Sequence, residues 1–494
     1  MAGINVEHDI WKHLMEVMDR LEKVEANARE QHRKDTAKIK ELETKIEELE
    51  QRNQLLQNEI DRLKHKDDTD SHNSSLPPST DQRPRKAPNE YNGRKQTGGK
   101  NGGQKGHPGR TRLLEETKQK LRELGIEPTI EEIGDLSRQY KERLILDIAM
   151  TAQATIKRFH EGTDGKYHIP EAYHSEVVYG NNVKALVVLL NGQGVQSAER
   201  IVELLATISG QAIHLSQGTV YEWLEDFHRQ AVLVELPVIE SRLLDHGVVS
   251  TDGTVTTVNG QQTSIRNFSV SKWVLYTSVD RKNIESLRGI PFLAKVAGTL
   301  IHDHETALYH FGTDHAECNV HLIRYLIANS ENTEHQWSRK MISLFAEMNR
   351  YRKRLIADGQ TEIPQKMLLR MEARFDELLT FARHERKQHP ARFRWATQEE
   401  TSLLNRLKKY KRNHLLFLHD FDVPFDNNMS ERDLRKCKNR QKMAGGFRTS
   451  HGKDIFCSVL SVTETCKRQS LNLMDAFRSI FLRHPLFACS CMAE

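Results

Sequence analysis

A heptad repeat of apolar residues near the amino terminus constrains this chain most, because it requires a long helix that buries one narrow face against a partner. The steps between its members alternate between three and four residues. Isoleucine lies mostly at the a positions and leucine at every d position, which favours a two-stranded parallel coiled coil. Asn53 falls at an a position, where a pair of buried amides fixes the register of the two helices at a cost in stability. The predicted dimerisation residues are Ile39, Leu42, Ile46, Leu49, Asn53, Leu56, Ile60 and Leu63.

The charges beside this seam support the pairing of two parallel helices. Of the four pairs that join a g position to the following e position of the partner, three are attractive and none is repulsive. A single amphipathic surface helix would explain neither these charges nor Asn53. The apolar phase continues toward the amino terminus, but Glu25, His32 and Asp35 interrupt it. We therefore predict a separate short helix there, within a dimerisation region of residues 1–66.

The positive charge of the chain is concentrated, although its formal net value is only +5. Residues 71–112 hold nine Lys or Arg and two acids. Pro77 and Pro78 end the preceding helix and several glycines follow, so we expect residues 67–112 to form a flexible linker. A flexible polycation releases counterions when it meets phosphate, which favours sequence-independent DNA binding over a merely solubilising role. The candidate DNA-binding residues of this linker are Arg83, Arg85, Lys86, Arg94, Lys95, Lys100 and Lys105.

The overall composition is that of a globular protein. With 37% hydrophobic and 29% charged residues, the sequence excludes a collagen, a mucin and a fully disordered chain. No apolar run approaches the roughly 18 residues of a membrane span, and the amino terminus has no apolar signal core. All six cysteines lie at or after Cys318, too few for the disulfide framework of a secreted domain. We therefore predict a cytoplasmic protein with reduced thiols and no contact with a membrane.

The segment from 113 to 240 has a mostly helical pattern. It predicts charged amphipathic helices over 113–124 and 130–148, a β-ribbon over 155–178, and then two helices about a turn at Gly210. The hydroxyl of Ser216 is placed to cap the second of these helices. Two short helices about such a turn are compatible with a DNA-binding helix-turn-helix, but an ordinary helical hairpin explains the same pattern.

After Leu244 the periodicity changes from helical to extended. Three β-rich runs between 247 and 279, separated by turns at Asn259-Gly260 and around Ser271, predict an antiparallel meander. A helix over 284–296 and a fourth strand over 298–303 follow. Asp252 and Asp303 then end or interrupt neighbouring strands. Taken alone, Asp252 could be an ordinary Asp-Gly turn residue and Asp303 a solvated acid.

A third acid lies far along the chain, in a basic segment. Glu431 has an ordinary explanation, since with Asn428 it fits a capping box at a helix start. Yet from Glu431 to Lys453 there are eight Lys or Arg against two acids, a setting that suits a site holding metal and phosphodiester together. The candidate phosphate-binding residues beside Glu431 are Lys438, Arg440 and Lys442, although Lys438 and Arg440 could instead be solvated helix charges.

With these residues the chain resembles a DDE transposase of the insertion sequence 66 family over most of its length after the coiled coil. No single motif is decisive, and the order and spacing of several carry the resemblance. They are Asn73-Ser74-Ser75 with Pro77-Pro78-Ser79, residues 102–109, Ser250-Thr251-Asp252-Gly253, Ile301-His302-Asp303, residues 318–321 with Arg324, residues 426–428 and 430–435, residues 439–442 with Gly446, and the helix 458–465.

The resemblance implies a fold and a chemistry. It implies an α/β ribonuclease-H-like core in which Asp252, Asp303 and Glu431 are the catalytic acids and bind two Mg²⁺ or Mn²⁺ ions. Such an enzyme nicks the terminal inverted repeats of an insertion sequence and joins the freed 3′ ends to target DNA in the bacterial cytoplasm or nucleoid, in some elements with accessory proteins. A catalytically inactive, transposase-derived dimer that only binds DNA is the alternative.

The spacing of the acids predicts where the core is interrupted. From Asp252 to Asp303 there are 51 residues, enough for three strands, a helix and a fourth strand. From Asp303 to Glu431 there are 128 residues, so a helical insertion over 333–420 is implied, with helical stretches at 334–357, 363–388 and 398–418. The expected core then comprises residues 241–332 and 421–494. A mostly helical DNA-binding region of residues 113–240 and the coiled coil precede it.

Zinc is not predicted. Cys318 and His321 form a C-x-x-H pair, but no second pair with ligand spacing lies nearby, so a lining or packing role is favoured. Relatives in the family often carry a cysteine zinc module after the glycine-rich linker, whereas residues 113–200 of this chain hold no cysteine. Only the histidines remain in that region: His160, His168 and His174.

Overall fold

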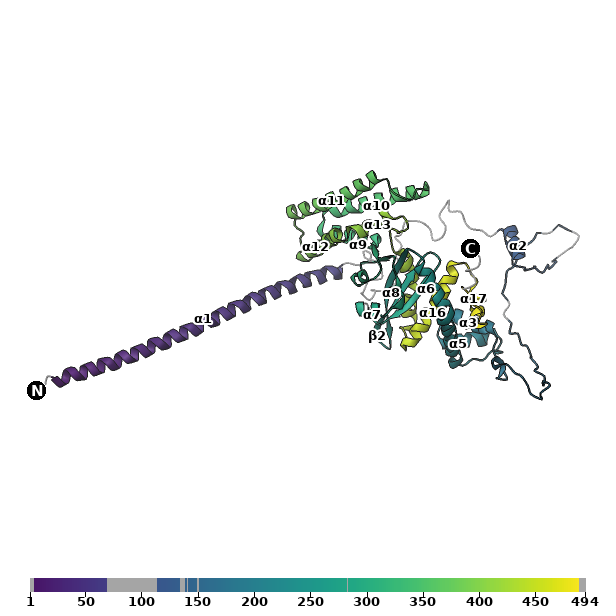
Figure 1. Cartoon of the computed structure of the whole chain (residues 1–494), viewed down its shortest axis with the longest axis horizontal. Helices are drawn as coiled ribbons and strands as arrows, with labels where there is room; N and C mark the ends of the chain where they lie inside the picture. Colours follow the sequence, from purple (N-terminus) through teal and green to yellow (C-terminus); the bar gives the residue numbers. More distant parts are fainter. Residues whose placement is uncertain are drawn as a thin grey trace. The chain divides into compact units, whose positions relative to one another are not determined.

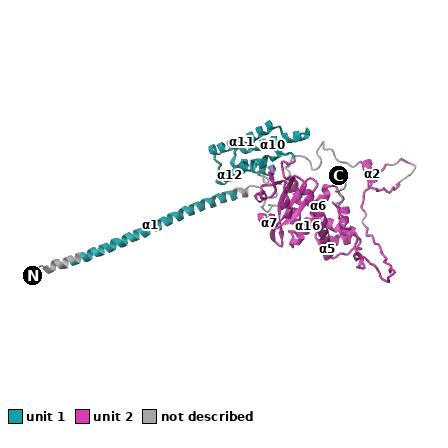
Figure 2. Ribbon diagram, in the orientation of Figure 1, with its two compact units in different colours: residues 1–84, 319–421 teal, residues 85–318, 422–494 magenta. Residues whose placement is uncertain are grey.

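The computed structural model describes residues 4–68, 113–133, 138–139, 141–148, 151–281 and 283–487. The chain divides into two compact units (Figure 2). Among the described residues, the first unit contains the long amino-terminal helix and residues 319–421, and the second contains the other described residues. Within these residues, no helix combines the length and the apolar character that crossing a bilayer requires.

The amino-terminal segment is one uninterrupted helix, α1 (Ile4–Asp68) (Figure 1). The prediction of a separate short helix was therefore wrong. Polar residues such as Glu25 and His32 break the apolar stripe, but no glycine or proline breaks the helix itself. The seven apolar residues of the predicted seam, from Ile39 to Leu63, remain between 43% and 59% exposed in the single chain. Nothing within the described chain covers this seam, so its pairing with a second copy stays a prediction.

The rest of the first unit is helical. Its core contains the fully buried rings of Trp337, Phe345 and Phe375. Each of the expected stretches is helical, and the last of them divides at Tyr410. The left-handed backbone of Gly359 follows the first stretch. The helices are α9 (Asn319–Thr333), α10 (Gln336–Ala357), α11 (Gln365–Gln388), α12 (Arg394–Lys409) and α13 (Lys411–His419).

The second unit contains a five-stranded mixed sheet with the strand order β3-β2-β1-β4-β5. The first three strands form the predicted antiparallel meander, and positive φ angles at Asn259 and Gly260 make the tight turn between β1 and β2. The fourth strand then returns parallel to the first, and the fifth lies parallel to the fourth. The strands are β1 (Val248–Val258), β2 (Gln261–Ser269), β3 (Val274–Val279), β4 (Thr299–His302) and β5 (Asp314–Glu317).

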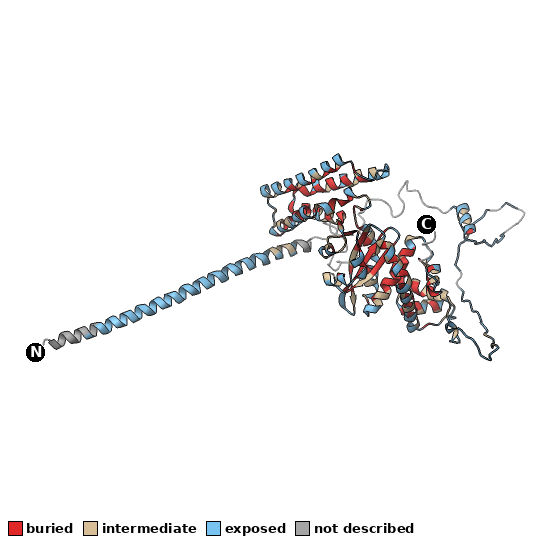
Figure 3. Cartoon of the chain, viewed as in Figure 1, coloured by how far each residue is buried: buried red, intermediate tan, exposed pale blue. Residues whose placement is uncertain are grey.

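Helices cover this sheet, and buried residues concentrate in the sheet and in α16 (Figure 3). The long helix α16 (Ser450–Arg468) packs against β3, where Ser461 Oγ accepts the Tyr276 backbone N–H at 2.8 Å. The predicted helix over 284–296 is two short helices, because Gly289 and Pro291 interrupt it. The other helices of this unit near the sheet are η3 (Ala231–Glu235), α6 (Leu236–Leu244), α7 (Ile284–Arg288), α8 (Pro291–Lys295), η4 (Thr306–His310), α14 (Asn428–Asp433), α15 (Arg435–Ala444) and α17 (Leu473–Phe481).

The two helices about Gly210 are present, and the second has the predicted serine cap at its start. Ser197 caps α4 (Ala198–Ile208), and Ser216 Oγ accepts the Thr219 N–H at 3.0 Å to cap α5 (Gln217–Gln230). Eight residues separate them, more than the three or four of a typical helix-turn-helix. DNA binding by this pair therefore stays a prediction. Both helices pack against α3 (Asn181–Gly192).

Two predictions in the segment from 113 to 178 were wrong. The helix α2 (Leu114–Glu123) is present, but the described part of 130–148 is not helical. Its four isoleucines, at 130, 133, 145 and 148, are between 78% and 91% exposed, so no apolar surface is available to stabilise an amphipathic helix. The predicted β-ribbon is reduced to one antiparallel bridge between Glu161 and Tyr167, followed by the short η2 (Glu171–Tyr173).

Candidate active site

Asp252 and Asp303 lie on neighbouring parallel segments of the sheet, Asp252 within β1 and Asp303 directly after β4. The register of β1 and β4 pairs Ser250 with Ile301, and each aspartate follows two positions after its residue of this pair. Neighbouring strands lie about 4.8 Å apart, so the two carboxylates are within reach of a common ligand. Both residues are half-buried. The sheet therefore brings together two acids that are 51 residues apart in the sequence.

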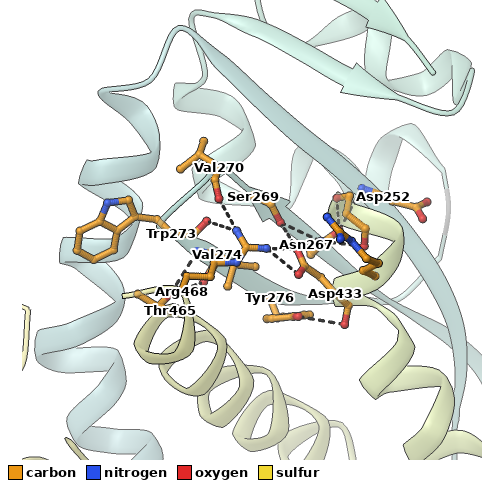
Figure 4. Close-up of polar contacts among 12 residues, drawn as sticks. Asp252, Asn267, Ser269, Val270, Trp273, Val274, Tyr276, Asp433, Thr465 and Arg468 are labelled. Atoms are coloured by element: carbon orange, nitrogen blue, oxygen red, sulfur yellow. Dashed lines mark hydrogen bonds and ion pairs between the residues drawn. The ribbon is translucent and has the colours of Figure 1, made fainter. Parts of the chain in front are cut away.

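The amide of Asn267 connects Asp252 to the helix that carries Glu431 (Figure 4). Asn267 lies opposite Asp252 on β2 and is fully buried. Its Oδ1 accepts the Asp252 backbone N–H at 3.2 Å and the hydroxyl of Ser430 at 2.8 Å. Because Ser430 directly precedes Glu431 on α14, this one amide fixes the start of that helix against the strand that holds Asp252.

A second buried amide connects the same helix to Asp303. Asn427 Nδ2 donates to the Thr251 carbonyl at 2.9 Å and lies 3.5 Å from Asp303 Oδ1. Its backbone N–H donates to the sulfur of Cys318 at 3.2 Å. Asp252, Asp303 and the first turn of the helix that bears Glu431 therefore belong to one network of contacts. Cys318 is buried beside this network, and its lining or packing role stays a prediction.

The first turn of α14 is not the capping box that offered an ordinary explanation for Glu431. Asn428 is already helical and exposed, and its N–H donates to Asp426 Oδ1 at 3.0 Å. The residue at the cap is Asn427, whose side chain is turned into the core and makes no cap hydrogen bond. The capping function is thus supplied by Asp426, and Glu431 is not needed for it.

Asp433, two residues beyond Glu431, has a structural role. Its carboxylate receives two 2.6 Å hydrogen bonds from the Arg468 guanidinium and one from the Ser269 hydroxyl, also at 2.6 Å (Figure 4). Asn267 Nδ2 donates to it as well, at 3.2 Å. This carboxylate holds α14 to β2 and α16. By contrast, Glu431 is not part of that cluster.

A buried arginine and a group of neutral histidines surround the two aspartates. Arg266 is 2% exposed; it donates to the Thr251 hydroxyl at 3.0 Å and pairs with Glu305. Burial lowers the pKa of His302 to about 3 and also lowers the pKa of His315, so both imidazoles are neutral. Arg266 is therefore the charged base of this group, and its partner is Glu305.

The basic residues after Glu431 divide into two kinds. Lys438 and Lys442 are exposed and lie one helical turn apart on α15, where both can meet a phosphate. Arg440 is half-buried between the rings of Phe447 and Phe456, each 5.5 Å from its guanidinium carbon, and burial lowers its pKa. Arg440 therefore has a packing role that the sequence did not reveal.

Two sets of predicted residues lie elsewhere. All seven linker cations, from Arg83 to Lys105, are outside the described residues. Among the histidines of the region without cysteine, His168 hydrogen-bonds to Asp164 at 3.0 Å and His174 to the Ile169 carbonyl at 3.2 Å.

The donor atoms around the acids fit a hard divalent cation. Asp252, Asp303 and Glu431 offer carboxylate oxygens and are only half-buried. Asn427 Oδ1 is buried and has no hydrogen-bond partner among the described residues, so an amide oxygen is also available. Oxygen donors of this kind are the preferred ligands of Mg²⁺ and Mn²⁺.

The sequence suggested the three acids as candidates but did not point to the residues that hydrogen-bond beside them. Asn267 carried one indication, since asparagine is unfavourable inside a strand and this one lies in a mostly buried run. Asn427 belongs to the motif of residues 426–428, but the sequence did not indicate what its side chain binds. Nothing in the sequence distinguished Asp433, as a structural acid, from Glu431.

Comparison with known protein families identifies two matching families. The Transposase IS66 family matches residues 176–454, more than half of the chain, and this range contains all three acids. A family of unknown function, DUF6444, matches residues 28–113, which include much of α1. No curated protein matches the chain. The chain belongs to the Transposase IS66 family, as the resemblance of its motifs predicted.

Proposed function

We propose that the protein is an active DDE transposase that binds the ends of an insertion sequence and cuts and joins DNA with two divalent cations. One observation carries the proposal: Asn267 and Asn427 connect Asp252, Asp303 and the first turn of α14, which bears Glu431, into one cluster. A three-strand meander, helices and two further parallel strands precede this helix, the order that a ribonuclease-H-like core implies.

In this proposal Asp252, Asp303 and Glu431 hold Mg²⁺ or Mn²⁺. Two such ions supply an activated water or 3′-hydroxyl and stabilise the leaving oxygen of an in-line displacement at phosphorus. The two buried amides keep the carboxylates in place. Lys438 and Lys442 bind the phosphates of the DNA beside the cleaved bond, with Arg440 as a packing residue behind them. The linker cations, the helical region before the sheet and any accessory proteins of the element add further DNA contacts.

Cleavage of DNA tests the proposal. The full chain is mixed with a duplex that carries the ends of its element, in Mg²⁺ or Mn²⁺. We expect 3′-end nicks and joined products, and at least a 10³-fold loss of both in Asp252→Asn, since the ligand set is broken. Glu285→Gln, an exposed acid on α7, is the matched control and should retain the activity of the parent. If the parent binds the ends but neither nicks nor joins them, and Asp252→Asn changes nothing, the protein is the inactive DNA-binding dimer instead.

We also propose that α1 pairs with α1 of a second copy as a parallel coiled coil, so that the transposase acts in the bacterial cytoplasm as a dimer or higher oligomer. The exposed seam from Ile39 to Leu63 supports this, since seven large apolar side chains in one stripe favour burial. Asn53→Ile should raise the melting temperature of the helix and broaden the oligomeric states in sedimentation, because the amide pair that restricts them is lost. An unchanged mass and melting temperature would count against the seam.

A further inference from the structure

The helical part of the first unit carries a strong positive charge that neither the linker nor the residues near Glu431 account for. Residues 319–421 hold 20 Lys or Arg against 12 acids, a net charge of +8 that exceeds the +5 of the whole chain. The helix α10 contributes most to it, with six Lys or Arg and a single acid. A surface with this balance attracts a polyanion.

Five of the six cations on α10 share its outward face. They recur at helical spacing and are exposed, whereas the sixth, Arg352, is buried and donates to the Phe421 carbonyl. Among the described residues, none of the five has an ion-pair partner. We refer to them as the α10 stripe: Arg339, Lys340, Arg350, Lys353 and Arg354.

The single acid of α10 does not neutralise the stripe, because another helix already neutralises it. Arg374 on α11 binds the two carboxylate oxygens of Glu347 at 2.6 and 2.8 Å. This hydrogen-bonded ion pair holds the pKa of Glu347 below its usual range. Arg350 also contributes to this shift, so the other four cations of the stripe carry most of the charge that faces solvent.

One end of the stripe opens into a groove. Helices α10 and α11 line a space of about 540 Å³, to which Arg339, Lys340 and Phe381 contribute. The Lys340 ammonium lies 3.9 Å from the centre of the Phe381 ring, which is 36% exposed. The ring therefore orders the Lys340 side chain at the mouth of the groove without neutralising its charge.

We propose that the α10 stripe is a DNA-binding surface that holds the phosphate backbone of a duplex, separate from the linker and from Lys438 and Lys442. From Arg339 to Arg354 the helix extends about 22 Å. At about 3.4 Å per base pair, that length matches roughly six phosphates of one strand. The inference rests on the proposed function, which names DNA as the partner, but the stripe lies in the unit that holds none of the three acids.

Salt-dependent binding of the full chain to DNA tests the stripe. The probe is a fluorescent 40-base-pair duplex of arbitrary sequence, titrated at several KCl concentrations without divalent cations. Each lost phosphate contact lowers the slope of log K against log salt by about 0.9, so we expect R350Q/K353Q/R354Q to lower it by about 2 to 3. The affinity at 0.1 M salt should fall on the order of 100-fold.

The control K23Q/R33Q/K40Q removes the same charge from exposed positions of α1 outside the seam and should change the slope by less than about 0.5. An equal loss in both variants, or an unchanged slope in the stripe variant, overturns the proposal.

Acetylation of the unmodified protein gives a second measurement that needs no variant. Bound DNA should protect Lys340 and Lys353 but not Lys23, and equal labelling overturns the proposal. Because neither measurement requires cleavage, failure of the nicking assay and failure here are distinguishable.

Discussion

Both units of the protein bury acids, but they use them differently. In the first unit, Glu400 is 1% exposed, and its carboxylate contacts His335 Nδ1 at 2.6 Å, Trp337 Nε1 at 2.7 Å and Arg386 Nε at 3.0 Å. In the second unit, Asp252 and Asp303 are half-buried, and buried amides hold their surroundings. A carboxylate enclosed by donors from several helices joins those helices together. A half-buried carboxylate, whose neighbouring backbone is fixed by buried amides, can still bind a ligand from solvent.

Two neighbouring residues of α14 show the same difference within a single turn. Asp433 is bound by Arg468, Ser269 and Asn267, while Glu431 stands outside that cluster. These donors therefore identify Asp433 as a structural acid, which residue type and local sequence do not.

Among these acids, the largest loss of folding stability should come from Glu400→Ala. It leaves Arg386 and His335 without their buried partner, which typically costs about 3 to 5 kcal/mol. We expect faster hydrogen exchange across α10 and α12 and a lower melting temperature. The exposed neighbour Glu399→Ala is the matched control and should change neither by much. If both variants melt like the parent, the Glu400 cluster does not hold these helices together.

A smaller effect on stability, with a specific effect on activity, should follow Asn427→Ala. Loss of its hydrogen bond to the Thr251 carbonyl leaves a buried acceptor unpaired, at about 1 to 3 kcal/mol. Because the same amide lies against Asp303, the proposed cleavage should need more Mg²⁺ for half-maximal rate. Asn428→Ala, an exposed asparagine next in the chain, is the control. Equal Mg²⁺ dependence in both variants would mean that Asn427 only supports the fold.

The elements that could be predicted from the sequence are those specified by residues close together in the chain. The meander was predictable because Asn259-Gly260 specifies a tight turn between β-rich runs, and the cap at Ser216 was predictable because serine is a common residue at a helix start. The helix over 130–148 was wrong because amphipathic spacing does not supply a surface to pack against. Asn267 and Asn427 were missed for the same reason. Their partners are 15 to 176 residues away, and only the folded sheet brings them together.

The smallest change in stability should come from substitution of Glu235, another buried acid of the second unit. Its carboxylate accepts the backbone N–H groups of Leu486 at 2.8 Å and Phe487 at 3.1 Å. Although these donors favour the charged form, burial is the larger influence and raises the pKa of Glu235. Folding therefore favours the protonated acid, so its contribution to stability is present below the ordinary pKa of glutamate and is lost as the pH rises through the raised value.

Glu235→Gln replaces the acid with a neutral group that can still accept one of the two N–H groups. At acidic pH the variant should melt below the parent, and the difference should shrink or reverse at pH 8, within about 1 kcal/mol. The measurement is the melting temperature of both proteins at pH 5 and pH 8, with Glu285→Gln to correct for the general effect of charge. A difference that grows toward pH 8 would show that the two N–H groups outweigh burial. In that case two backbone donors would be enough to keep a buried acid charged without a cation beside it.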